Sequence, residues 1–170
     1  MNRNLFFLLI TFILFSCKEN SKIPANTKKE SKPKTEKQDN ITTEISTDIS
    51  QLQKLTDFSK FRPEKVKFKY TFIDNSNGRV PGPSDSFLEA ILYFDDKTME
   101  KIQEISQNEE ASNLNYQKKA FKFDWLEKQV LSELESSDSL KNIHPDLIFG
   151  TNNGECWYLK NKILLKKETN

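Results

Sequence analysis

Histidine, cysteine and glycine are scarce in this chain, and their scarcity limits the chemistry that it can carry. The 170 residues include one histidine, two cysteines and four glycines. A metal site with several histidine ligands therefore cannot be built, and we predict neither a metal nor another cofactor. The glycine-rich loops that bind phosphates and the Gly-x-Ser-x-Gly turn of serine hydrolases are absent from the sequence as well. The sequence assigns no catalytic residue.

A strong excess of charge is also missing. The chain has 26 lysines and arginines and 25 aspartates and glutamates, and residues 51–170 alone contain 18 basic and 19 acidic side chains. Proteins that bind nucleic acids usually carry a basic patch, since neutralising phosphates supplies most of their affinity. Nucleic acid is therefore not an expected partner.

The chain begins with a short apolar segment. Polar and basic residues at positions 2–4 precede an apolar run at positions 5–15, which is interrupted only by Thr11. This layout is typical of a secretory signal peptide. A membrane-spanning helix needs about 20 apolar residues. We therefore expect a segment that is removed and not one that stays in the membrane.

The end of that segment, Leu14-Phe15-Ser16-Cys17, resembles the lipobox of bacterial lipoproteins. The resemblance implies cleavage after Ser16 and attachment of lipid, including palmitate, to Cys17. Several acyl chains give a stable membrane anchor. Lys18 follows the cysteine where some lipoproteins retained at the inner membrane have aspartate, so we expect an outer-membrane location, periplasmic or surface-exposed. The alternative is an ordinary signal peptide with a chance cysteine.

Three regions follow from the composition. Residues 1–16 are the predicted signal peptide, and residues 17–50 are predicted to be the lipidated cysteine with a disordered spacer, because this stretch lacks aromatic residues and is rich in Lys, Glu, Ser and Thr. Its lysines also allow an anionic-surface role. Residues 51–170 are long enough for a single domain.

Strands and helices are expected as follows. Residues 65–72 alternate, with Val66, Phe68, Tyr70 and Phe72 on one face, which predicts a half-buried strand. Residues 87–94 are apolar on both faces, which favours a central strand. Asp95 or Asp96 is expected to cap a helix that carries Met99, Ile102 and Ile105 on its buried side.

The C-terminal part is expected to hold a second helix and three strands. Residues 121–123 are predicted to be extended, and Asp124 and Glu127 have the spacing of a capping box before a stripe of apolar residues, Leu126, Val130, Leu131 and Leu134. Strands are expected at 147–150, 155–160 and 163–167, with turns at 152–154 and 161–162. The predicted fold is α+β, an antiparallel sheet of about five strands with two helices packed on one face.

Individual residues that could carry chemistry also have simpler interpretations. His144 is either an exposed loop residue or a general base, and Cys156 is either a small buried side chain in a strand or a nucleophile. Trp125 and Trp157 lie among residues with a core pattern, although each could stack on a sugar ring. The structural interpretation is favoured for all four.

Acidic pairs are interpreted in the same way. Asp95-Asp96 is better explained by helix capping than by a glycosidase or calcium site. Glu109-Glu110 lies in a polar stretch with no nearby partner and is expected to be solvated.

A long connection joins the two confident strands and is the candidate binding loop. Its residues include Asn75, Asn77, Arg79, Pro81, Gly82, Pro83 and Asp85. Hairpin loops usually have two to five residues, so a longer one is either functional or merely a connection. Both interpretations remain open.

These features favour a lipid-anchored cell-envelope protein whose small, non-enzymatic domain binds another macromolecule, as an inhibitor, an immunity-type factor or an accessory subunit. The expected partners are the membrane, through lipid on Cys17, and a protein. One alternative is a hydrolase of an envelope polymer that uses carboxylates. Another is a structural envelope component. A carboxylate pair in a deep cleft would favour the enzyme, and a shallow exposed apolar patch would favour the binding protein.

Overall fold

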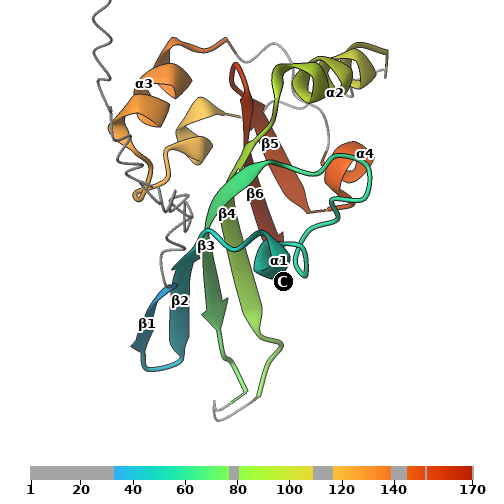
Figure 1. The fold of residues 1–170 in the computed structure, drawn as a ribbon. Coiled ribbons are helices and arrows are strands. Elements are labelled where there is room, and N and C mark those ends of the chain that lie inside the picture. Colours follow the sequence, from blue (N-terminus) through green and yellow to red (C-terminus); the bar gives the residue numbers. More distant parts are fainter. Residues whose placement is uncertain (1–32, 77–80, 109–116, 139–144, 152, 170) are drawn as a thin grey trace, which may run out of the picture.

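A six-stranded antiparallel sheet forms the centre of the structure (Figure 1). The computed structural model describes residues 33–76, 81–108, 117–138, 145–151 and 153–169. The strand order is β1-β2-β3-β4-β6-β5. The strands are β1 Lys34–Gln38, β2 Ile41–Ser46, β3 Lys65–Ile73, β4 Asp85–Tyr93, β5 Gly154–Tyr158 and β6 Lys162–Thr169. The predicted α+β class with an antiparallel sheet is confirmed, with six strands in place of about five.

Two longer helices and several short ones pack around the sheet. They are α1 Ile49–Leu52, α2 Asp96–Asn108, the 3₁₀ helix η1 Lys118–Phe121, α3 Lys128–Ser136 and α4 Asp146–Phe149. Within the described residues, no helix combines the length and the apolar character needed to cross a membrane. The amide of Thr98 donates to the Asp95 carboxylate over 2.9 Å, so the predicted cap of α2 is confirmed.

The predictions for β3 and β4 are confirmed. Val66 and Phe68 of β3 are buried, and the lysines that alternate with them lie on the other face. In β4, Ala90 and Leu92 point to one face and Ile91 to the other, and all three are fully buried. Apolar side chains on both faces require cover on both sides. The interior position of β4 supplies this cover.

Helices cover both faces of the sheet, so the prediction of two helices on one face is wrong. A larger cluster, the α2-side core, contains Met99 and Ile102 of α2, with Leu52 of α1 and Phe149 of α4. A smaller cluster on the other face, the α3-side core, contains Val130 and Leu134 of α3, with Phe121, Ile91, Trp157 and Leu164. The alternating side chains of β4, β5 and β6 supply both cores, so the helices had to divide between the two faces.

The sheet also begins earlier than the sequence indicated. The composition predicts a disordered spacer over residues 17–50, but residues 34–46 form the hairpin β1–β2, and all six residues of β2 pair with β3. The turn has the left-handed residue Asp39, with φ of 49°, a conformation that Asp and Asn tolerate. Composition alone misses such strands, because backbone hydrogen bonds to an existing sheet edge supply much of what holds them.

The predicted capping box at Asp124 and Glu127 is also wrong. α3 begins at Lys128, and Glu127, at the cap position, makes no side-chain capping bond. Instead, Asp124 forms an ion pair with Lys69 at 2.9 Å and Glu127 one with Lys67 at 3.2 Å. Phe121 ends η1 and is not in an extended segment. Asp124 and Glu127 therefore hold the segment before α3 against the polar face of β3.

The predicted strand 147–150 is the helix α4. Pro145 lies at its N-cap in helical conformation, and Gly150, with φ of 58°, ends it in the left-handed region. Pro before a helix and Gly after it are its usual boundaries. The following strands are confirmed as β5 and β6, and the turn at 161–162 is closed by the amide of Leu159, which donates to the Lys162 carbonyl over 2.9 Å. Because the element before β5 is the helix α4, the predicted turn at 152–154 does not connect two strands, and position 152 lies outside the described residues.

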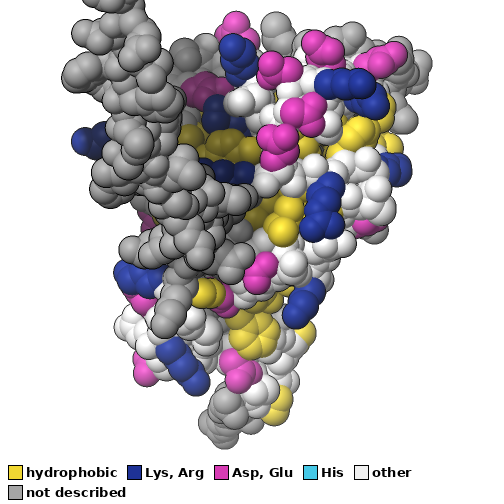
Figure 2. Space-filling model, viewed as in Figure 1, with side chains coloured by type: hydrophobic (Ala, Val, Ile, Leu, Met, Phe, Trp, Pro, Cys, Tyr) yellow, Lys and Arg dark blue, Asp and Glu magenta, His cyan; other side chains and the backbone are white. Residues whose placement is uncertain are grey.

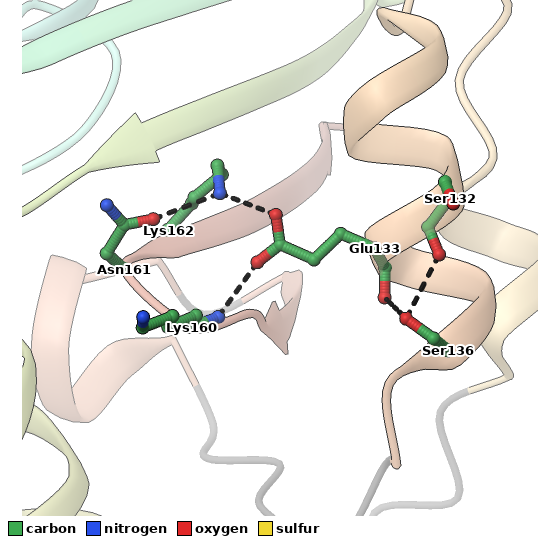
Figure 3. Close-up of polar contacts among 6 residues, drawn as sticks. All are labelled: Ser132, Glu133, Ser136, Lys160, Asn161 and Lys162. Carbon is green, nitrogen blue, oxygen red and sulfur yellow. Dashed lines mark hydrogen bonds and ion pairs between the residues drawn. The ribbon is translucent and has the colours of Figure 1, made fainter.

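Glu133 joins α3 to the turn between β5 and β6 (Figure 3). One carboxylate oxygen accepts from the Lys160 amide at 3.0 Å, and the other pairs with the Lys162 ammonium at 2.5 Å. The Lys162 ammonium also donates to the Asn161 side-chain oxygen. Both members of the ion pair are mostly shielded from water, with 26% and 15% of their side chains exposed. This contact fixes where α3 lies along the sheet.

The extent of the domain can be tested by truncation. Removing residues 1–32 should leave a domain that unfolds cooperatively, whereas removing residues 1–50 deletes β1 and β2 and exposes the edge of β3. Since six residues of β2 pair with β3, the shorter chain should lose at least about 2 kcal/mol of unfolding free energy. Urea denaturation of both chains measures the difference. Equal unfolding free energies would place residues 33–50 outside the fold.

Glu133 offers a second test with a matched control in the same helix. Glu133→Ala removes two charge-assisted hydrogen bonds at a largely shielded site, and it should lower the unfolding free energy by about 1–3 kcal/mol. Glu135 also forms a 2.5 Å ion pair, with Lys122, but that pair is well exposed. Glu135→Ala should leave the unfolding free energy nearly unchanged. An equal loss in both variants would contradict the anchoring role of Glu133.

Candidate functional site

Among the described residues, the helices leave the end of the sheet near the β3–β4 hairpin tip uncovered on the α2 side. Residues that pair directly across the strands share a face, so the register defines rows of side chains. One row contains Ser46, Phe68, Ala90, Leu165 and Cys156, all of them buried. The next contains Glu44, Tyr70, Leu88, Lys167 and Gly154, of which only Leu88 and Gly154 are buried. Burial therefore decreases toward the tip of the β3–β4 hairpin.

The last two rows on this face are the candidate site, which we term the Phe72 surface. It consists of Glu44, Tyr70, Leu88 and Lys167 together with the outer row Thr42, Phe72, Ser86 and Thr169. Phe72 has 37% of its surface exposed, although it is large and apolar. Figure 2 shows hydrophobic side chains on the lower part of the molecule, below the position of α1, with charged side chains of both signs around them.

The opposite face of the same strands has a different character. Lys69, Glu89, Lys166 and Glu155 pair in turn across β3, β4, β6 and β5, so their charges alternate in sign. Oppositely charged neighbours across strands stabilise a sheet. Glu89 also accepts from the Trp125 indole at 2.6 Å. This face therefore satisfies its charges within the molecule, which leaves the Phe72 surface as the stronger candidate for an external contact.

A shallow pocket of about 150 Å³ lies on the Phe72 surface, beside the turn that follows α1. Its lining consists of Lys54, Leu55, Tyr70, Ser86, Leu88, Lys167 and Thr169. Lys167 donates to the Leu55 carbonyl over 3.1 Å, which ties β6 to this turn. The Ser86 and Thr169 hydroxyls bond to each other. The pocket thus has apolar walls and two lysines but no carboxylate, histidine or cysteine among its lining residues.

The candidate loop continues from the outer row of the Phe72 surface. The Asn75 side-chain amide donates to the Pro83 carbonyl at 3.0 Å and to the Asp85 carboxylate at 3.1 Å. Asn75 and Asp85 therefore close the base of the loop. Pro81, Gly82 and Pro83 are exposed, and a Cβ on Gly82 would meet no atom within 4 Å. Asn77 and Arg79 lie outside the described residues.

The other residues singled out from the sequence have structural positions. Cys156 is fully buried, and burial raises the pKa of its thiol, as expected of a packing residue. Trp157 is buried, and Trp125 is partly buried and stacks on Phe123. The hydroxyl and amide of Thr98 hold the pKa of Asp95 below its usual value. Cys17, His144 and Glu109-Glu110 lie outside the described residues.

No group of three or more histidine, cysteine, aspartate or glutamate side chains converges within the described part of the chain. The lysines and Tyr70 of the pocket were not singled out from the sequence. The only available signal was the alternation of 65–72, because Phe72 lies on the apolar side of a strand that extends past its helix cover.

Comparisons with known proteins give no match. No protein-family model matches the chain, and neither a curated protein nor a solved structure is similar enough to it to count as a match.

Proposed function

We propose that this protein is a lipid-anchored component of the bacterial cell envelope whose domain binds another protein through the Phe72 surface. The observation that carries the proposal is the uncovered half-sheet with its exposed Phe72. Exposed apolar side chains that are rimmed by polar ones on the surface of a protein often mark a contact with another protein. The proposed role is that of an inhibitor, an immunity-type factor or an accessory subunit.

The rigidity of the surface supports this role. Phe72 and Tyr70 lie on β3, whose residues 68–73 pair with β2 on one side and whose residues 65–73 pair with β4 on the other. A rigid side chain loses little freedom when it binds, so more of the contact energy remains as affinity. The exposed Pro81-Gly82-Pro83 segment adjoins this surface. We include the candidate loop, with Arg79, in the contact.

The anchor places the surface at the membrane. The lipobox-like residues Leu14-Phe15-Ser16-Cys17 lie sixteen positions before Pro33, the first described residue. Lipid on Cys17 would hold the domain within reach of other envelope proteins. We propose the outer membrane as its location, since Lys18 follows the cysteine.

The proposed binding surface is tested by a pair of variants. Phe72→Ala should weaken capture of the partner from native envelope membranes by about tenfold or more, since removing a central aromatic contact typically costs more than 1 kcal/mol. Ile41→Ala is the matched control: Ile41 is 40% exposed, and the register places it on the opposite face of the sheet. Quantitative affinity capture followed by mass spectrometry compares both variants with the wild type.

The comparison also defines what would refute the surface. A protein retained by the wild type and by Ile41→Ala, but lost with Phe72→Ala, supports the proposal. Equal loss with both variants would indicate non-specific apolar binding, and equal retention would place the contact elsewhere. Both of these outcomes contradict the proposed surface.

The anchor has its own test. Cys17→Ala should abolish incorporation of radiolabelled palmitate and move the protein from the membrane fraction to the soluble fraction. Cys156→Ala is the control, because Cys156 is the other cysteine of the chain and is fully buried. Labelling of the Cys17→Ala variant at the wild-type level would remove the anchor from the proposal.

A further inference from the structure

We infer that the pocket beside α1 receives one acidic side chain, a glutamate or aspartate, of the protein that binds the Phe72 surface. This inference rests on the proposed function for its partner, and it concerns the part of the Phe72 surface that lies beside the turn after α1. The pocket is lined by Lys54, Leu55, Tyr70, Ser86, Leu88, Lys167 and Thr169.

The size of the pocket favours a single side chain. Its volume is about 150 Å³, whereas sites for drug-sized ligands and cofactors have about 300–1,000 Å³. A glutamate side chain has a short apolar stem and a compact charged end. Leu55, Leu88 and the ring of Tyr70 can contact the stem. The polar side chains of the lining, Lys54, Lys167, Ser86 and Thr169, can bind the carboxylate.

The charge of the lining favours an anion. A lysine ammonium has three donors, and Lys167 uses one of them on the Leu55 carbonyl. Lys54 is exposed and forms no ion pair with another described residue. The nearest carboxylate in the register of this face is that of Glu44, opposite Tyr70, and it accepts from the Gln51 side chain at 2.6 Å. The pocket thus offers unused positive donors beside an apolar wall.

The position of the pocket next to Phe72 favours a ligand group that is part of a bound protein. Tyr70 is a member of both the pocket and the Phe72 surface, and Phe72 follows two residues later on the same face of β3. A partner side chain that packs on Phe72 would therefore lie next to the pocket. Lysine and carboxylate pairing gives register and specificity at such a contact.

The inference is tested with small probes on the full chain in detergent, labelled with ¹³C at the leucine methyl groups. N-acetyl-glutamate amide carries the acidic side chain without charged termini, and N-acetyl-glutamine amide is its neutral isostere. The acidic probe should shift the Leu55 and Leu88 methyl signals saturably and leave Leu134, in the α3-side core, unmoved. Inorganic phosphate serves as the third probe.

Two variants of the pocket lysines and one control identify the charge responsible. Lys54→Gln changes an exposed side chain and should weaken binding of the acidic probe by about threefold to tenfold. Lys97→Gln, at an exposed position of α2 outside the pocket, should not change it. Lys167→Gln should also weaken binding, with the unshifted Leu134 signal showing that the fold is retained.

The possible outcomes separate this inference from the proposed function. Equal shifts with the neutral probe, tighter binding of phosphate than of the acidic probe, or no shift at saturating probe would each overturn the acidic side-chain pocket. No partner takes part in these titrations. The pocket can therefore fail while Phe72-dependent capture succeeds, and it can succeed while that capture fails.

Discussion

The burial of β4 on both faces is the constraint on which the rest of the structure depends. Leu92 and Ala90 enter the α2-side core, and Ile91 between them enters the α3-side core. A strand with apolar side chains on both faces must lie inside a sheet and be covered on both sides. The division of the helices between the two faces and the positions of β3 and β6 on either side of β4 follow from this requirement. Glu133 then fixes α3 at one end of the sheet, next to the turn between β5 and β6.

The same arrangement leaves the candidate site open. The helices cover the rows of Val66 and Phe68, but the strands continue to Tyr70 and Phe72, beyond the end of that cover. On the α3 side, the row of Lys69, Glu89, Lys166 and Glu155 carries charges of alternating sign, and the next row carries Thr43, Thr71, Phe87 and Glu168. On the α2 side, the rows at this end carry Tyr70, Phe72 and the lysine-lined pocket. Two faces of one half-sheet therefore differ in what they can bind, and the proposals for function and for an acidic partner group both depend on that difference.

The sequence predicted the elements in which the order of apolar and polar side chains matches the burial of each face. The alternation of apolar and polar residues at 65–72 predicted β3, and the apolar residues on both faces of 87–94 predicted β4. Asp95 predicted the start of α2. The failures have physical reasons. β1 and β2 carry few apolar residues, because much of their stabilisation comes from backbone pairing. Asp124 and Glu127 have capping spacing, but they pair with lysines of β3, a contact between segments more than fifty residues apart. The lysines of the pocket, Lys54 and Lys167, come from distant segments, so no local pattern marks them.

Coincident unfolding of the two cores is the most direct test of the account. Trp125 and Trp157, the two tryptophans of the chain, both belong to the α3-side core, whereas Met99, one of the two methionines, lies in the α2-side core. Urea unfolding followed by tryptophan fluorescence and by the Met99 methyl resonance should give the same midpoint. Ile91→Ala and Leu92→Ala, which remove apolar contacts on opposite faces of β4, should each lower both midpoints together. Separate transitions, or a variant that shifts the signal of one core alone, would contradict the claim that β4 couples the two halves into one fold.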